Sequence, residues 1–225
     1  MKAFARLFLF GVLASLVFAT AAAAAEKSPE RVVQGSIITS QRDPAITIHL
    51  PKEVSYAGAA RWDLYGICDA ELHVFVEADK HKHVQRLYWV QFEHYLPDNN
   101  DTYNYPFTEK LTLGGREFDV TTNFRPTLTP PARAGSDRER VLQLVQQAGY
   151  QLPPETMSVR LVHLLDDTKR QELMFIYAED LSLSGTSVAA LQAAGGEAKW
   201  PELRAALIQR ATQRIQLEFA ASASR

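Results

Sequence analysis

The sequence predicts an α+β fold, in which an antiparallel β-sheet built from hairpins packs against helices on one of its faces. The prediction depends on the order of the local signals. Segments rich in β-branched and aromatic residues precede the first clear helix, and a further pair of such segments lies between that helix and the helical C-terminal part. A doubly wound fold would instead alternate strands and helices along the whole chain.

Two short strands are expected first, at residues 36–40 and 45–50. Both segments are short and rich in β-branched residues, and Asp43-Pro44 separates them. We expect residues 52–61 to form a loop or a short helix that leads into longer strands.

Two longer strands follow, at residues 62–78 and 84–96, and Gly66 indicates a bulge or bend within the first. Both are rich in the β-branched and aromatic residues that favour a pleated, half-buried surface. The next stretch, residues 97–106, has the Asn, Asp and Pro content of an irregular loop.

A tight turn joins the two longer strands, and pairing Lys80 with His83 sets their register. An acidic residue then lies opposite a basic one and two aromatic residues face each other, which stabilises a sheet. The resulting cross-strand pairs are Glu77 with Arg86, Phe75 with Tyr88, His73 with Val90, Glu71 with Phe92, and Asp69 with His94.

The C-terminal half begins with a strand at residues 118–124 and a connection rich in Pro and Thr at 125–135. Ser136 and Glu139 have the spacing of a capping box, in which each side chain bonds to the other residue's free backbone N–H. This spacing predicts that a helix begins at Ser136.

A second hairpin and further helices are expected after this first helix. The hairpin consists of residues 157–165 and 171–178, and in the predicted register His163 lies opposite Glu172. A last helix over residues 201–219 has proline at its first turn, a position that proline favours.

Residues 1–25 have the order of regions that defines a secretory signal peptide. Lys2 and Arg6 form a basic start, Leu7–Phe18 is continuously apolar, and Ala21–Ala25 supplies small residues for cleavage. An uncleaved membrane anchor is the alternative, but the strongly hydrophobic part is short for a bilayer span. The sequence therefore predicts export to a periplasmic or extracellular location, with no membrane association after cleavage.

The mature chain, residues 26–225, is interpreted as a single soluble domain, and a subdomain boundary near 126–135 is the alternative. Its length is sufficient to bury a substantial hydrophobic core. Removal of Lys2 and Arg6 with the signal peptide changes the formal net charge from −2 to −4, because two cations are lost. Phosphate binding needs a concentrated basic surface, so we expect no nucleic-acid partner.

The chain has one cysteine, which excludes an internal disulfide and a zinc site built from several cysteines. This residue, Cys68, lies among apolar neighbours and is followed directly by Asp69, whose charge disfavours a reactive thiolate. We therefore interpret Cys68 as a small buried core residue.

Alternation along the two longer strands places aromatic and titratable side chains on one face of the sheet. The opposite face is mostly aliphatic, and we expect it to pack under the helices. A mixture of aromatic and titratable groups is typical of the lining of a ligand cleft. This His face, as we call it, consists of Asp69, Glu71, His73, Phe75, Tyr88, Phe92 and His94.

Four interpretations of the His face stay open. In the first, a ligand is bound without catalysis by Glu71, His73, Phe75, Tyr88, Phe92 and His94. In the second, Asp69 orients His94 as a general base, with His73 or Glu71 as its partner. In the third, His73, His94 and an acidic neighbour form an open metal site. In the fourth, the face is partly solvated and its histidines are satisfied bystanders.

The loop at 97–106 carries Tyr103 and Tyr105, which are candidates for an aromatic lid over the His face. Aromatic residues in long loops also commonly anchor the loop to the body of the protein. Both interpretations are compatible with the sequence.

The sequence favours an exported protein that binds a small molecule or an envelope protein through the His face, without catalysis and without a metal or other cofactor. The first alternative is a hydrolase-like enzyme that uses Asp69 and His94 as a general-base pair. The second is an accessory subunit of an envelope complex. No nucleophile motif, phosphate loop or dinucleotide-binding motif is present to favour an enzyme.

Overall fold

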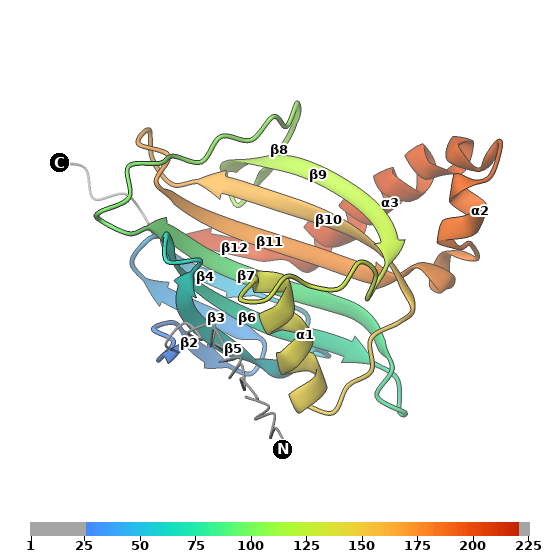
Figure 1. Cartoon of the computed structure of the whole chain (residues 1–225), viewed down its shortest axis with the longest axis horizontal. Helices are drawn as coiled ribbons and strands as arrows, with labels where there is room; N and C mark the ends of the chain where they lie inside the picture. The colour runs from blue at the N-terminus through green and yellow to red at the C-terminus, as the bar shows by residue number, and fades with distance from the viewer. Residues whose placement is uncertain (1–25, 221–225) are drawn as a thin grey trace, which may run out of the picture.

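The fold is mostly antiparallel β-sheet with few helices (Figure 1). The computed structural model describes residues 26–220, and the predicted signal peptide lies outside the described residues. The strands form two sheets, in which every pair of neighbouring strands is antiparallel. No helix in this described part is long and apolar enough to cross a membrane.

The larger sheet consists of two meanders, β5-β6-β7 and β8-β9-β10-β11, joined where β7 pairs with β11. The short β1 extends its edge beside β5. In spatial order the strands are β1 (Glu26–Lys27), β5 (Ser55–Leu64), β6 (Cys68–Ala78), β7 (Val84–Tyr95), β11 (Gln171–Asp180), β10 (Glu155–Leu164), β9 (Arg116–Pro126) and β8 (Glu109–Leu113).

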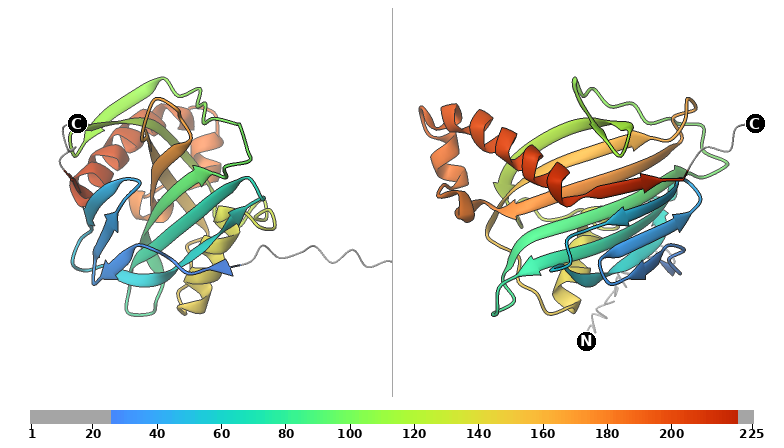
Figure 2. Two further views of the ribbon diagram at one scale, coloured as in Figure 1. Left: turned by 90° about the vertical axis from the view of Figure 1, so that its left-hand side faces the viewer. Right: turned by 180° about the vertical axis from the view of Figure 1, so that it is seen from behind.

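The smaller sheet combines the two ends of the described chain. Its last strand follows directly on a helix and then lies beside β4, as the view from behind shows (Figure 2). The strands, in spatial order, are β12 (Gln216–Phe219), β4 (Ala45–His49), β3 (Ile37–Gln41) and β2 (Val32–Gln34).

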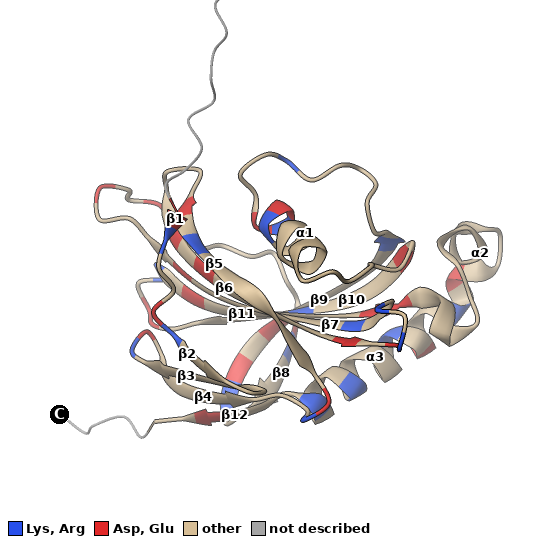
Figure 3. Cartoon of the chain, turned by 90° about the horizontal axis from the view of Figure 1, so that it is seen from below, with Lys and Arg blue, Asp and Glu red and all other residues tan. Residues whose placement is uncertain are grey.

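The helices lie on both faces of the larger sheet (Figure 3). Helix α1 (Asp137–Gln147) packs on one face, whereas α3 (Trp200–Arg214) packs on the other, together with the smaller sheet. The predicted packing of helices on one face alone is therefore not what the described residues show. The shorter helical segments are η1 (Leu181–Ser184), α2 (Val188–Gln192) and η2 (Gly196–Lys199).

Alternation along the central strands produces a separate hydrophobic core on each face. On β6, Leu72 and Val74 belong to the core under α1, whereas Phe75 belongs to the core under the smaller sheet. The helices contribute to these cores accordingly, with Val141 of α1 in the first and Leu207 of α3 in the second. The central strands are therefore buried on both faces.

The predicted register of the β6–β7 hairpin is confirmed from Glu77 opposite Arg86 to Asp69 opposite His94. The predicted pairing of Lys80 with His83 is wrong, because the register shifts after Glu77 and the backbone N–H of Asp79 bonds to the carbonyl of His83 at 3.0 Å. The predicted register of the second hairpin is wrong by one residue, because its turn contains one more residue than expected. Leu164, and not its neighbour, lies opposite Glu172. Directly opposed side chains lie on the same face of a sheet. A shift of one residue therefore means that side chains predicted to share a face point to opposite faces.

Other predicted elements also differ from the structure. The strand predicted over residues 62–78 is divided by a turn at residues 65–67 into the end of β5 and the whole of β6. Residues 52–61, expected as a loop or short helix, lie largely in β5, whose small residues allow α1 to approach closely. A Cβ atom added at Gly58 would lie 3.0 Å from a methyl carbon of Leu144. The helix predicted over 201–219 ends at Arg214, because residues 216–219 pair with β4 instead.

The predicted start of α1 is confirmed. Ser136 Oγ accepts a hydrogen bond from the backbone N–H of Glu139 at 3.1 Å. The Glu139 carboxylate returns to the backbone N–H of Gly135 at 2.7 Å, one residue earlier than in the usual capping box.

Candidate functional site

The His face lies inside the molecule, between the two sheets. Phe75, Tyr88 and Phe92 belong to the same buried core as Ile38 and Ile48 of the smaller sheet. Of the polar members, Asp69, Glu71 and His73 are buried, with Glu71 1 % exposed and His73 0 % exposed, whereas His94 is half-buried near the end of β7. None of the pockets described below is lined by these residues. Their predicted role in ligand binding stays a prediction, and their contacts are those of a structural core.

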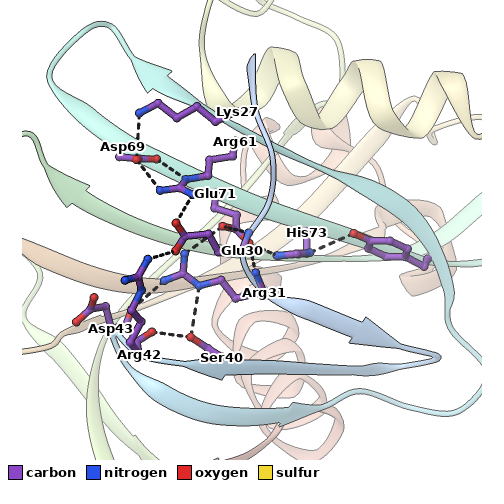
Figure 4. A network of polar contacts seen from close by, with 11 residues as sticks. Lys27, Glu30, Arg31, Ser40, Arg42, Asp43, Arg61, Asp69, Glu71 and His73 are labelled. Atoms are coloured by element: carbon purple, nitrogen blue, oxygen red, sulfur yellow. Dashed lines mark hydrogen bonds and ion pairs between the residues drawn. The ribbon is translucent and has the colours of Figure 1, made fainter. Parts of the chain in front are cut away.

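A polar network holds the N-terminal segment of the described chain on this face (Figure 4). The Glu71 carboxylate accepts hydrogen bonds from the backbone N–H groups of Glu30 and Arg31, both at 2.8 Å, and from the Arg31 guanidinium at 3.1 Å. His73 Nε2 lies 2.9 Å from Glu71, and His73 Nδ1 lies 3.1 Å from the Tyr56 hydroxyl. The Glu71 carboxylate therefore has four hydrogen-bonding partners, and all of them belong to the protein itself.

The protonation of Glu71 follows from these contacts. Burial by itself raises the pKa of a carboxyl group, but the hydrogen bonds from His73, Glu30 and Arg31 reverse the effect and lower the pKa of Glu71 to about 2. Glu71 is therefore a charged structural residue whose donors are already placed around it.

The two residues of the candidate general-base pair, Asp69 and His94, are adjacent in the sheet, but among the described residues no hydrogen bond joins them to each other. Asp69 lies opposite His94 in the register, yet its carboxylate binds the Arg61 guanidinium through two contacts of 2.9 Å. Lys27 donates a further bond to Asp69 at 3.1 Å. Burial raises the pKa of Asp69, but the bonds from Arg61 and Lys27 lower it below its usual range. A carboxylate held in this way does not orient His94.

The described residues also contain no group of three or more His, Cys, Asp or Glu side chains placed to hold a metal ion. His73 and His94 are therefore not brought together with a third ligand in this part of the chain. Cys68 is buried, as predicted, and burial raises the pKa of its thiol to about 11.

A pocket of about 300 Å³ lies on the opposite face of the larger sheet, beneath α1. We call it the α1 pocket. Strands β7, β11, β10 and β9 form its floor, and their register aligns side chains in rows across the sheet. One row consists of Leu87, Ala178, Ser158 and Asn123, and the next consists of Trp89, Ile176, Arg160 and Thr121.

The α1 pocket changes character across these rows. Its β7 and β11 side is apolar, with Leu87, Trp89 and Ile176, and Val141 and Leu142 of α1 add apolar surface from above. Its β10 and β9 side carries hydroxyl, amide and guanidinium groups. Such a pocket can bury an apolar molecule and can also bind one polar group at a defined end.

Three arginines line the polar side of the α1 pocket: Arg125 on β9, Arg138 on α1 and Arg160 on β10. Arg138 donates to the backbone carbonyl groups of Thr127 and Pro130, at 2.6 and 2.7 Å. These bonds fix the guanidinium of Arg138 against the connection that precedes α1. Arg125 is exposed at the rim.

A pair of buried glutamates lies further along the same face of the sheet. Glu93 on β7 is directly opposite Glu172 on β11, and both side chains are almost inaccessible to solvent. Burial is the main cause that raises the pKa of each carboxyl group, and for Glu172 the charge of Glu93 adds to it. Two adjacent carboxylates without a cation between them favour the protonated form of at least one.

Arg160 connects this glutamate pair to the α1 pocket. Its guanidinium lies 3.8 Å from the Glu172 carboxylate and donates to the Tyr105 hydroxyl at 3.2 Å. Tyr105 in turn donates to Glu172 at 2.5 Å, and its ring stacks on Phe107, with centroids 5.0 Å apart. Phe107 lines the pocket, so the loop at 97–106 leads directly to the pocket wall.

Of the two interpretations of Tyr103 and Tyr105, a lid over the His face does not agree with the structure. Both lie over the opposite face, where the Tyr103 hydroxyl is 3.1 Å from the Glu93 carboxylate and Tyr105 bonds to Glu172. Buried carboxyl groups attract these hydroxyl donors, so the tyrosines anchor the loop to the body of the protein.

Two other pockets are less suited to an apolar ligand. One lies beside β1 and is lined by Lys27, Arg61 and Arg140, and the other lies beside β4 and is lined by His49, Glu53 and other polar groups. Both are formed chiefly by charged and polar side chains.

Comparisons of the chain with protein-family models, curated proteins and solved structures find no match. The α1 pocket is therefore interpreted from its own chemistry. No histidine or cysteine lines it, and its carboxylates, Glu179 and Asp180, are already engaged. Glu179 pairs with Arg210 at 2.8 Å, and Asp180 accepts the backbone N–H of Ser182 at 2.9 Å. Binding is the chemistry that these residues support.

The α1 pocket is not among the sites that we predicted, although the sequence contains a signal for it. On β10, Thr156, Ser158 and Arg160 alternate with Met157 and Val159. Such strict alternation indicates that one face is only partly covered. The error of one residue in the second hairpin's register concealed which polar side chains of β11 share that face.

Proposed function

We propose that this protein is a binding protein without catalytic activity, which takes a small and largely apolar molecule into the α1 pocket. The observation that carries the proposal is an open, mainly apolar pocket between helix α1 and the larger sheet. Its volume of about 300 Å³ is at the lower end of the range for ligand pockets. A medium-sized molecule fits this volume better than a peptide or a large cofactor.

The walls of the pocket support reversible binding of such a molecule. Trp89 and Phe107 present aromatic surface from two different elements, and Val141 and Leu142 face them from α1. Phe107 is held by stacking on Tyr105, which is itself bonded to Glu172. A preformed wall of this kind reduces the ordering cost of binding.

We include export in the proposal on the basis of residues 1–25. The expected mature N-terminus is Glu26, which begins β1 at the edge of the larger sheet. Mass spectrometry of the protein secreted by, or released from the envelope of, the native cell tests this. A mature chain that starts at Glu26 supports export, and a full-length chain in the cytoplasm contradicts it.

The binding proposal is tested with N-phenyl-1-naphthylamine, a neutral apolar fluorophore that brightens when it leaves water. We expect saturable binding to the wild-type protein and loss of it in Ala178→Phe, which fills the pocket floor. Leu142→Trp fills the pocket from α1 and serves as a second variant in case the first fails to fold. Ala189→Phe, at an exposed position of α2, is the matched control.

The outcomes are distinct. Binding that both pocket-filling variants lose and the control retains supports the proposal. No saturable binding by the wild-type protein, or unchanged binding in both folded filling variants, overturns it. Thermal unfolding of each variant establishes that it is folded at the temperature of the titration.

A further inference from the structure

Two guanidinium groups at the polar end of the α1 pocket are not neutralised by the residues around them. Arg125 and Arg138 both line the pocket, and within residues 26–220 neither forms an ion pair with a carboxylate. Burial lowers the pKa of Arg138, and the nearby charge of Arg125 lowers it further. Two cations that repel each other beside a pocket are stabilised by an anion bound between them.

The nearby carboxylates are directed elsewhere. Glu179 pairs with Arg210 at 2.8 Å, and Arg86 Nε lies 3.7 Å from the same carboxylate. Asp137, the nearest acid on α1, accepts the backbone N–H of Arg138 at 2.7 Å, and burial raises its pKa. The third pocket arginine, Arg160, is directed toward the glutamate pair, where its guanidinium lies 3.8 Å from Glu172 and donates to the Tyr105 hydroxyl. The positive charge at the α1 end of β9 is therefore available to a ligand.

The apolar and charged ends of the pocket are built on different strands. The charged end is formed by β9 and the start of α1, whereas Leu87 and Trp89 on β7 form the apolar end, three strands away. Neighbouring strands are about 4.8 Å apart. The distance from β9 across β10 and β11 to β7 is therefore about 14 Å at the backbone, which matches an extended chain of medium length.

We infer that the ligand of the α1 pocket is an amphipathic anion, with an apolar chain against Trp89 and Leu87 and a carboxylate or phosphate head group at Arg125 and Arg138. The inference rests on the proposed function, because it concerns the occupant of the same pocket. A guanidinium binds carboxylate and phosphate through the same paired N–H groups, so the structure specifies the charge of the head group and not its central atom.

The experiment is displacement of N-phenyl-1-naphthylamine by three ligands with the same chain: octanoate, octyl phosphate and octan-1-ol. We expect at least one anion to displace the probe at a concentration about tenfold lower than the alcohol, as charge-assisted hydrogen bonds imply. The tighter of the two anions identifies the head group. Added salt is expected to weaken the anions and to leave the alcohol unchanged.

Variants locate the head group. Arg125→Gln is expected to remove most of the tenfold preference for the anion while binding of the neutral probe is retained, and Arg125→Lys is expected to keep part of it. Arg116→Gln, at an exposed position of the same strand, is the matched control. Arg138→Gln provides a second variant, with thermal unfolding measured because its bonds also hold residues 127–130.

The two proposals fail in different ways. If the alcohol and the anions displace the probe equally, or if Arg125→Gln and Arg138→Gln both keep the full preference, the inference is wrong and the binding proposal stands. If the neutral probe does not bind at all, the binding proposal itself fails.

Discussion

Replacement of Glu71 by glutamine tests whether the His face is a structural core. Glutamine is close in shape to a protonated glutamate, so Glu71→Gln imitates permanent protonation of the buried group. The amide would place an N–H₂ group among donors that belong to Glu30, Arg31 and His73, and at least one of them would lose its acceptor. We therefore expect a loss of stability and no direct effect on ligand binding.

The size of this loss follows from the pKa of Glu71. The shift is from 4.5 to about 2, and each pKa unit corresponds to about 1.4 kcal/mol. The free energy of unfolding should therefore fall by about 3 kcal/mol at pH 7, in line with the cost of breaking a buried charged pair from one side. For a chain of this size the melting temperature should fall by about 6–12 °C.

The stability that Glu71 contributes depends on pH in one direction. Because the folded pKa is lowered, the stabilisation is present above the ordinary carboxyl pKa and is lost as pH falls through 4.5 toward 2. The difference between wild type and Glu71→Gln should therefore be largest at pH 6–7 and should shrink below pH 4.5. Urea unfolding at a series of pH values measures it.

Asp98→Asn, at an exposed loop position, is the matched control and should change stability by less than about 0.5 kcal/mol. A loss below about 1 kcal/mol for Glu71→Gln at pH 7 would refute the reasoning, as would a difference that stays constant between pH 6 and 3. If folded Glu71→Gln lost binding of the fluorescent probe, the His face would again be a candidate ligand site.

Three further predictions concern other parts of the structure. Burial and the adjacent Glu93 raise the pKa of Glu172, so its contribution to stability falls as pH rises above the ordinary carboxyl range; Glu172→Gln should unfold at a higher urea concentration than wild type at pH 9 but not at pH 5. Gly114→Ala should lower the free energy of unfolding by about 2–3 kcal/mol, because Gly114 has a φ of +58° and an added Cβ would lie 2.7 Å from the Leu217 side chain of β12. Gly115→Ala should lower it by about 1 kcal/mol, because Gly115 has a φ of +74° but open space around it. Equal losses of stability in thermal unfolding would contradict this prediction. Ser136→Ala should cost about 1 kcal/mol and weaken probe binding, because it removes the cap that positions α1 over the pocket; a stability loss without any change in binding would show that α1 keeps its place.

Local patterns were sufficient to predict several elements of the fold. The cross-strand pairing of Glu77 with Arg86 and of Phe75 with Tyr88 set the β6–β7 register, because side-chain complementarity acts between directly opposed residues. The capping residue Ser136 located the start of α1 for a similar reason, since its bond is made within one helical turn. Both predictions depend on residues that are close in the sequence.

Elements that depend on distant residues were predicted less well. Residues 216–219 continue the apolar pattern of α3, and only pairing with β4 makes them a strand. The small residues of β5 have weak strand propensity, and the close approach of α1 to Gly58 explains why they are needed there. In each case a contact with a remote segment outweighs local propensity.

The candidate site shows the same division. By itself the sequence determined that the two sides of β6 and β7 differ, and which side chains share each side, because alternation in a strand is a local property. Only the tertiary structure decided which side is covered. The smaller sheet, assembled from both ends of the described chain, buries the His face, whereas α1 covers the other side only in part and leaves the α1 pocket open. The physical reason is that burial depends on what packs against a surface, and that partner is supplied by segments far away in the sequence.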